Sequence, residues 1–213
     1  YTNSWTYMVL MRAALSKIFP QYDLILSLDI DTIVNENINY LWWYHKFLDN
    51  YYLAAVREPC KSNDNFMAIN MGVVLFNLKK LREDKKDDEI IHALNTIKYE
   101  WNEQDCIAEK CQGAIYELPP DYNISNWVDL EKVHHRKIMH FAANKEYREL
   151  PIVKKYAQGF GTFNQPDNDF SLDIIIPAYN DVKGLERTLK SIYNSGWITI
   201  TVVNDCSKED YTS

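Results

Sequence analysis

Apolar residues along the chain follow two patterns: helical spacing over longer segments and short continuous runs. Helical spacing predicts a first helix from apolar residues three or four positions apart, which are Trp5, Met8, Met11, Leu15 and Ile18. Pro20 ends this helix. The same spacing predicts further helices over residues 38–48, 87–97, 102–111, 146–156 and 181–193. Asn102 is predicted to cap the helix that it begins.

Short apolar runs bounded by polar or turn residues predict buried strands. They cover residues 24–28, 52–56, 69–76, 115–118, 138–141, 172–176 and 198–203. Strands that alternate with amphipathic helices are typical of α/β proteins, in which helices cover both faces of a central sheet. Ligands of such sheets bind at the carboxyl ends of the strands. The residues that directly follow each run are therefore the first candidates for a functional site.

The pattern is interrupted at residues 159–171, which are rich in Gly, Pro, Asn and Asp and show no periodicity. This composition predicts an interdomain linker. We therefore expect one domain over residues 1–158 and a second, partial α/β unit over residues 172–213. The second unit has the strand–helix–strand order that opens a doubly wound sheet.

Charge and cysteine content narrow the functional classes. Lys and Arg number 23 against 30 Asp and Glu, a net charge of −7, which argues against nucleic acid as the main partner. No apolar run approaches the roughly 20 residues that cross a bilayer. The four cysteines form no C-x-x-C pair, which favours a reduced, cytoplasmic location. The basic segment 132–137 favours a solvated loop, and contact with an anionic membrane is the alternative.

Asp29 and Asp31 are the first candidates for chemistry, because they directly follow the apolar run 24–28. Two carboxylates suit Mg²⁺ or Mn²⁺, and such an ion can bridge a diphosphate. Surface turns also produce Asp-x-Asp, so the spacing alone leaves this role open. His140 lies in another apolar run. It is either a buried structural histidine or a third ligand, which would favour Mn²⁺ over Mg²⁺.

Other polar residues each have a structural explanation beside a functional one. Asn70 lies within an apolar strand, where a buried amide needs a hydrogen-bond partner. Glu103 and Gln104 fall in the first turn of a predicted helix, where acidic residues complement the helix dipole. Arg12 interrupts the first helix and is either a surface residue or a donor to phosphate oxygens.

Four sequence blocks occur in an order that resembles family 8 glycosyltransferases. They are YMVLMRAALSKIFPQYDLILSLDIDTIV (7–34), INMGVVLFNL (69–78), WNEQDCIAEKCQGAIYELPPDYN (101–123) and IMHFA (138–142). The resemblance implies the Rossmann-like GT-A fold, a mixed sheet with flanking helices. It also implies a nucleotide-sugar donor.

The resemblance assigns roles around the metal and the donor. Asp29 and Asp31 match the Asp-x-Asp that holds Mn²⁺ and the nucleotide-sugar, and His140 matches the third ligand of that metal. Arg12 matches an arginine near the donor diphosphate. Asn70 matches an asparagine that lines the donor-sugar pocket.

The resemblance also places residues at the reacting sugar and the phosphates. Glu103 and Gln104 match the acidic residue and the glutamine beside the sugar's reacting face, with Glu103 where the family more often has Asp. Lys145 resembles a phosphate-binding lysine. Here the segment HFAANKEY lacks the family's Gly and ends in Glu146-Tyr147 where the family has Pro-Trp.

Both ends of the chain are expected to lie inside longer domains. The family's first strand, whose loop cradles the nucleotide base, has no counterpart before residue 7. At the other end, DIIIPAYN (173–180) and VVNDCSKED (202–210) resemble the opening of family 2 glycosyltransferases. That second resemblance implies that Pro177, Tyr179 and Asp205 line a uridine site.

Together these resemblances predict a bifunctional, Mn²⁺-dependent hexosyltransferase. It would move glucose or galactose from a UDP-sugar to a glycan or glycolipid with retention, as in polysaccharide biosynthesis at the inner face of the membrane. Mg²⁺ is the alternative metal. A degenerate domain that binds nucleotide-sugar or glycan without turnover is one alternative function. A nucleotide-sugar hydrolase is another.

Overall fold

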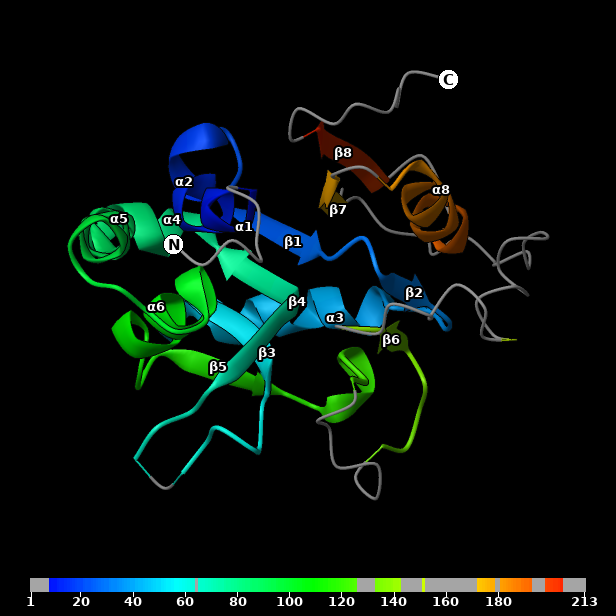
Figure 1. Cartoon of the computed structure of the whole chain (residues 1–213), viewed down its shortest axis with the longest axis horizontal. Helices are drawn as coiled ribbons and strands as arrows, with labels where there is room; N and C mark the ends of the chain where they lie inside the picture. The colour runs from blue at the N-terminus through cyan, green and yellow to red at the C-terminus, as the bar shows by residue number, and fades with distance from the viewer. Residues whose placement is uncertain are drawn as a thin grey trace.

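The centre of the protein is a six-stranded sheet with the order β5-β3-β4-β1-β7-β8 (Figure 1). The computed structural model describes residues 8–63, 65–125, 133–142, 151, 172–178, 181–192 and 198–204. The strands of the central sheet are β1 (Leu24–Leu28), β3 (Leu53–Arg57), β4 (Ile69–Asn77), β5 (Ile115–Leu118), β7 (Leu172–Ala178) and β8 (Ile198–Asn204). The predicted α/β class is confirmed.

Five of these strands run in the same direction. β3 pairs with β5, β1 with β7, and β7 with β8 in parallel, whereas β4 is antiparallel to both β1 and β3. The carboxyl ends of the five parallel strands therefore lie along one edge of the sheet. That edge is where α/β sheets bind their ligands.

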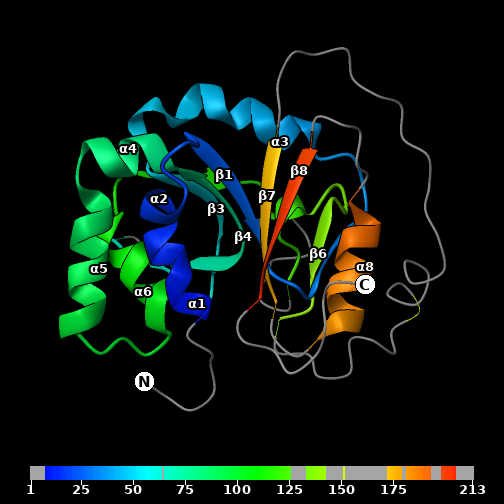
Figure 2. The ribbon, with the colours of Figure 1, turned by 90° about the horizontal axis from the view of Figure 1, so that it is seen from above.

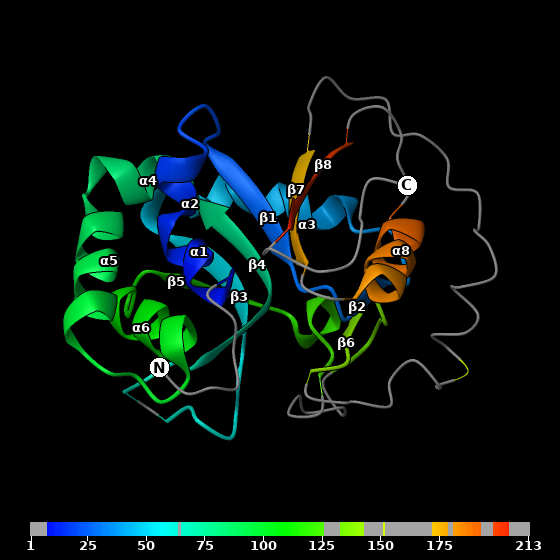
Figure 3. The ribbon, with the colours of Figure 1, turned by 45° about the horizontal axis from the view of Figure 1, so that its top comes forward.

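Helices cover one face of the sheet (Figures 2 and 3). They are α1 (Met8–Met11), the 3-10 helix η1 (Arg12–Ala14), α2 (Leu15–Ile18), α4 (Leu78–Glu83), α5 (Lys86–Thr96) and α6 (Asn102–Lys110). Their apolar side chains pack on strand residues such as Ile25 and Phe76. Because both residues are almost fully buried, this layer forms one half of the core.

The opposite face carries a mixed layer. It consists of α3 (Asn39–Trp43), the 3-10 helices η2 (Tyr44–Asn50) and η3 (Pro120–Tyr122), α8 (Val182–Ser191) and a two-stranded sheet of β2 (Thr32–Val34) and β6 (Ile138–His140). Leu26 and Leu28 of β1 face this layer, whereas Ile25 faces the other. A strand covered on both faces needs apolar residues at successive positions, which explains its continuous apolar run.

Most predicted elements are found close to their predicted positions, and the differences are local. The first predicted helix is divided into α1, η1 and α2, and the 3-10 segment carries the buried side chain of Arg12. The predicted helix 38–48 is likewise divided into α3 and η2. The helix predicted over residues 146–156 lies outside the described residues, apart from residue 151. None of the helices described is long and apolar enough to span a bilayer.

The prediction that Asn102 caps α6 was wrong. The N-cap position belongs to Trp101, and Asn102 is the first residue of α6, with a left-handed φ of +46°. Asn tolerates this left-handed region better than most residues do. The Trp101 N–H is bound by Asp105 Oδ2 at 2.9 Å. An acidic side chain one turn into the helix thus binds the N–H at its start.

The strand–helix–strand unit at the C-terminal end extends the same central sheet. β7 pairs with β1 at Leu26–Ile174 and Ser27–Ile175, and β8 lies on the outer side of β7. Asp181 caps α8 through a 2.8 Å hydrogen bond from Gly184 N–H. The predicted linker 159–171 lies outside the described residues. The division into domains at 1–158 and 172–213 therefore stays a prediction.

Candidate functional site

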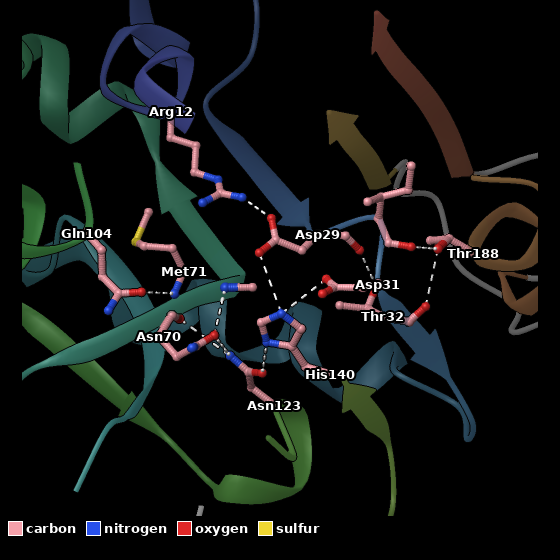
Figure 4. A network of polar contacts seen from close by, with 12 residues as sticks. Arg12, Asp29, Asp31, Thr32, Asn70, Met71, Gln104, Asn123, His140 and Thr188 are labelled. Atoms are coloured by element: carbon pink, nitrogen blue, oxygen red, sulfur yellow. Dashed lines mark hydrogen bonds and ion pairs between the residues drawn. The ribbon is translucent and has the colours of Figure 1, made fainter. Parts of the chain in front are cut away.

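The segment that follows β1, residues 29–32, is called the Asp loop here. Its backbone is tightly held: Asp29 N–H donates to Gly72 O at 2.8 Å, and Thr32 N–H donates to Asp29 O at 3.1 Å. The Thr32 hydroxyl also donates to Asp29 O, at 2.7 Å. The loop thereby directs the half-buried carboxylates of Asp29 and Asp31 toward β6 (Figure 4).

His140 is brought to these carboxylates by the small sheet. β6 pairs with β2 so that His140 lies opposite Thr32. The buried imidazole has its Nε2 at 3.2 Å from Asp31 Oδ1 and 3.6 Å from Asp29 Oδ2 (Figure 4). Each of the three residues offers one ligand atom, and these atoms all lie within 4.8 Å of one another.

The residues present fit a divalent cation. His140 Nδ1 lies 3.1 Å from Asn123 Oδ1, so with an ion bound a proton on Nδ1 would be donated to that amide and the Nε2 lone pair would be left for the ion. Burial acts to raise the pKa of Asp31, but His140 and, more weakly, Arg12 outweigh it, and the pKa lies below its usual range. An ionised carboxylate and a neutral imidazole are the forms that bind metal.

Gly72 leaves the space that the imidazole occupies. A Cβ at this position would lie 2.1 Å from Cε1 of His140. Only glycine, which has no Cβ, allows the His140 ring to come this close to the backbone of residue 72. The same strand places Asn70, whose Oδ1 accepts from Gly72 N–H at 2.9 Å and from Asn123 Nδ2 at 3.0 Å. Asn70 and Asn123 thus form a chain of hydrogen bonds that ends at His140.

Arg12 lies on the other side of Asp29, and its burial excludes the surface interpretation. Its Nη1 donates to Glu103 Oε1 at 2.9 Å, and its Nη2 forms an ion pair with Asp29. Burial raises the pKa of Glu103, and Arg12 acts against that rise. Among the described residues, Arg12 Nε is buried without a hydrogen-bond partner. The guanidinium thus contacts the two carboxylates through Nη1 and Nη2.

Gln104 is fixed at both ends of its amide. Its Oε1 accepts from Met71 N–H at 3.3 Å, and its Nε2 donates to Glu58 Oε2 at 3.2 Å. Glu58 directly follows β3 and is 2% exposed. Burial raises its pKa, although Cys60, Lys61 and the amides around it favour the charged form.

Sequence reasoning missed three residues of this arrangement, namely Glu58, Asn123 and Thr188. Glu58 had a usable indication, because an acidic residue at the carboxyl end of a predicted strand is the same feature that pointed to Asp29. Asn123 lies at the end of a block that resembles the family, but its contact with His140 depends on tertiary structure. Thr188 lies on α8 and binds the Asp loop from the C-terminal unit.

Four predicted site residues are not placed by side-chain geometry. Lys145, Tyr179 and Asp205 lie outside the described residues. Pro177 lies in β7, opposite Val203 of β8, and its side chain is not described. Their roles therefore stay predictions.

Comparison with known proteins assigns the family of this chain. The profile described as "Glycosyl transferase family 8" matches residues 1–146. A Haemophilus influenzae protein named as a candidate glycosyltransferase is 26% identical over 129 residues, which is 54% of this chain and 38% of that protein. This chain therefore spans well under half of the length of that curated relative.

Solved structures show the same fold. The bifunctional glycosyltransferase WbbM in its apo form matches with a TM-score of 0.56 and 18% identity, over 66% of this chain and 32% of the other. The galactosyltransferase LgtC, solved with donor and acceptor sugar analogues, matches with a TM-score of 0.53 and 19% identity, over 68% and 62%. The glycosyltransferase GlyE of Streptococcus pneumoniae TIGR4 matches with a TM-score of 0.53 and 18% identity, over 92% and 62%.

These similarities confirm the predicted GT-A fold. The family profile ends at residue 146, so the resemblance of residues 172–213 to family 2 glycosyltransferases stays a prediction. The match covers more than half of the sequence and contains the Asp loop, Asn70, Gln104 and His140. This chain belongs to glycosyl transferase family 8.

Proposed function

We propose that this chain carries the donor site of a Mn²⁺-dependent hexosyltransferase. The donor is UDP-glucose or UDP-galactose, the acceptor is a glycan or glycolipid, and the anomeric configuration is retained. Mg²⁺ is the alternative ion. The observation that supports this proposal is the convergence of Asp29, Asp31 and His140, whose ligand atoms lie within 4.8 Å.

Asp29, Asp31 and His140 would hold the ion. When bound, the ion acts as a Lewis acid that offsets charge on the leaving diphosphate. Arg12 would provide a second positive charge beside the same carboxylates, through the guanidinium that contacts Asp29. The ion pair with Asp29 fixes this guanidinium before any donor binds.

Gln104 and Glu103 would serve the reacting sugar. Because Met71 and Glu58 hold both ends of the Gln104 amide, its position is set without rearrangement. Fixed dipoles of this kind stabilise the positive charge that develops on a sugar ring during glycosyl transfer. Asn70 would line the sugar pocket, and Lys145 would bind phosphate.

The proposal also covers the C-terminal unit and the place in the cell where the acceptor is reached. Pro177, Tyr179 and Asp205 are proposed to line a uridine site, as part of a second, family 2-like transferase that would make the whole protein bifunctional. The acceptor is proposed to be reached at the cytoplasmic face of the membrane, with the basic segment 132–137 as a peripheral contact.

The decisive experiment replaces Asp31 by Asn in the protein that contains this chain. Amide and carboxylate have the same shape, so the change removes ligand charge with little effect on packing. We expect transfer from the UDP-sugar to fall by about 100-fold or more, which corresponds to roughly 2.7 kcal/mol of transition-state stabilisation. Asp23→Asn is the matched control, because Asp23 is an exposed carboxylate at the opposite end of β1. Equal transfer rates for Asp31→Asn and the unmodified protein would contradict the metal assignment.

The alternative functions predict different products. A binding domain without turnover releases no UDP from a UDP-sugar in the presence of Mn²⁺. A hydrolase releases free sugar even when acceptor is present. Measuring UDP, free sugar and glycosylated acceptor in one reaction separates all three.

A further inference from the structure

The C-terminal unit, composed of β7, α8 and β8, reaches the Asp loop from the side opposite Arg12 (Figure 4). The contact is made by Thr188 of α8, which is 0% exposed. Its hydroxyl donates to Ile30 O at 2.6 Å and lies 3.2 Å from Thr32 O. One side chain thus binds two carbonyl groups of the same loop.

These two carbonyl groups flank Asp31. The Ile30 carbonyl belongs to the peptide group that precedes Asp31, and the Thr32 carbonyl lies one residue beyond it. Asp31 O itself accepts from Phe141 N–H at 2.9 Å. The backbone around Asp31 is therefore held by Phe141, directly after β6, on one side and by α8 on the other, which favours one direction of its carboxylate.

A second hydroxyl one turn further along α8 makes a different contact. Ser191 Oγ accepts from Val34 N–H at 3.2 Å and donates to Thr188 O at 2.7 Å. Ser191 is as well buried as Thr188, but it binds the far end of β2 and no atom of the Asp loop. Substituting Thr188 should therefore disturb the Asp loop, whereas substituting Ser191 should weaken only the packing of α8 against β2.

We infer that Thr188 is a positioning residue for the metal site. By binding the carbonyl groups on both sides of Asp31, α8 keeps the loop in the conformation in which Asp31 faces His140. The C-terminal unit is then part of the donor site of this sheet, in addition to any role in a second domain. Supports of this kind that act through the first ligands typically change metal affinity by about 10- to 100-fold.

This inference rests on the proposed function, because it takes Asp31 as a metal ligand. It is tested with Mn²⁺ alone, titrated into the protein without nucleotide-sugar and followed by electron paramagnetic resonance. Thr188→Val removes the hydroxyl and keeps the shape, and we expect the Kd for Mn²⁺ to rise about tenfold. Thr188→Ser keeps the hydroxyl, and its Kd should stay within about twofold of the unmodified protein.

Ser191→Ala is the matched control, since it removes a buried hydroxyl from the same helix. It should lower the unfolding temperature as Thr188→Val does, but leave the Kd for Mn²⁺ unchanged. Equal loss of affinity in the Ser191 and Thr188 variants would overturn the inference, because stability alone would then explain both. If the valine variant does not fold, Thr188→Cys replaces it, since a thiol packs similarly and donates only weakly. An unchanged Kd in that variant would also overturn the inference.

Asp31→Asn separates this inference from the function on which it rests. If Asp31→Asn binds Mn²⁺ as tightly as the unmodified protein, the metal assignment itself fails. If Asp31→Asn loses Mn²⁺ while Thr188→Val retains it, the metal site stands and Thr188 is not its positioning residue.

Discussion

Two regions hold the Asp loop from opposite sides, and they do so with different chemistry. On one side, η1 and α6 place the Arg12 guanidinium between Asp29 and Glu103, so the contact is made by buried charges. On the other side, α8 places the Thr188 hydroxyl on backbone carbonyl groups. Both regions are buried, but only the first matches the family profile, which ends at residue 146.

The difference determines what each side can contribute. A buried charge that loses its partner is far more costly than a carbonyl group that loses one hydrogen bond. On the charged side, replacing Arg12, Asp29 or Glu103 alone leaves a buried charge without one of its partners. The hydroxyl side adjusts geometry at small energetic cost. Substitutions on the charged side should consequently have the larger effects.

Arg12→Met gives the largest expected effect on this comparison. The change leaves Glu103 and Asp29 without their buried cation, and removing one partner of a buried ion pair typically costs about 3–5 kcal/mol. We expect the free energy of unfolding, measured by urea denaturation, to fall by that amount at neutral pH.

The dependence of this loss on pH has a definite sign. Burial already raises the pKa of Glu103, and without Arg12 the rise is larger. A group with a raised pKa contributes its stability below its ordinary pKa and loses it as pH rises through the folded value. The destabilisation should therefore be greater at pH 7 than at pH 4. The double variant Arg12→Met/Glu103→Gln should recover part of the stability, and no recovery would show that the buried charge is not the cause.

Gly72→Ala should have the next largest effect, and it falls on metal binding as well as on stability. The added Cβ would lie 2.1 Å from Cε1 of His140, so the ring has to leave its place between Asn123 and the two carboxylates. We expect the Kd for Mn²⁺ to rise by roughly 100-fold. This is the upper end of the range that is typical when a metal ligand loses the groups that orient it. The measurement is a Mn²⁺ titration of the purified protein.

Gly113→Ala is the matched control for that substitution. Gly113 has a φ of +78°, and a Cβ there would meet nothing within 4 Å. The variant should lose about 1 kcal/mol of stability from backbone strain and keep its affinity for Mn²⁺. Unchanged Mn²⁺ binding in Gly72→Ala would mean that the ring is not needed where the structure places it.

The fold and two of the three metal-site residues could be predicted from the pattern of apolar runs and the residues that follow them. β1 and β4 are covered on both faces, so their sequences are continuous apolar runs that reveal their position. Asp29 and Asp31 could be predicted because the carboxyl end of a parallel strand is where ligands bind. His140 could not be placed in this way, since its approach depends on the pairing of β2 with β6.

Elsewhere local sequence permitted more than one structure. Asn102 is a good capping residue, but it also tolerates a left-handed backbone, and the fold uses the second property. The hydroxyl of Thr188 within an amphipathic helix carries no indication of its partner. Its partners are backbone carbonyl groups far away in sequence. Every residue has such a group, so the residue type at positions 30 and 32 gives no indication of the contact.

Glu58→Gln should have the smallest effect, and it compares two buried glutamates, Glu58 and Glu103, that have different partners. Glu103 is buried against a guanidinium, whereas Glu58 is buried against the amide of Gln104 and the Cys60 thiol. An amide at position 58 can still accept from Gln104, so the substitution removes the charge and keeps that hydrogen bond. Where charge alone costs stability, neutralising it should be mildly favourable, on the order of 1 kcal/mol.

The pH dependence identifies the cause. Burial raises the pKa of Glu58 above its ordinary value of 4.5, so its contribution to stability is present below pH 4.5 and is lost as pH rises through the folded pKa. Thermal unfolding should show Glu58→Gln equal to the unmodified protein near pH 4 and more stable near pH 8. Glu117→Gln is the control, because Glu117 is an exposed carboxylate of the neighbouring strand β5, and its difference should not grow with pH in this way. A loss of stability in Glu58→Gln at pH 8 would mean that position 58 requires a charge.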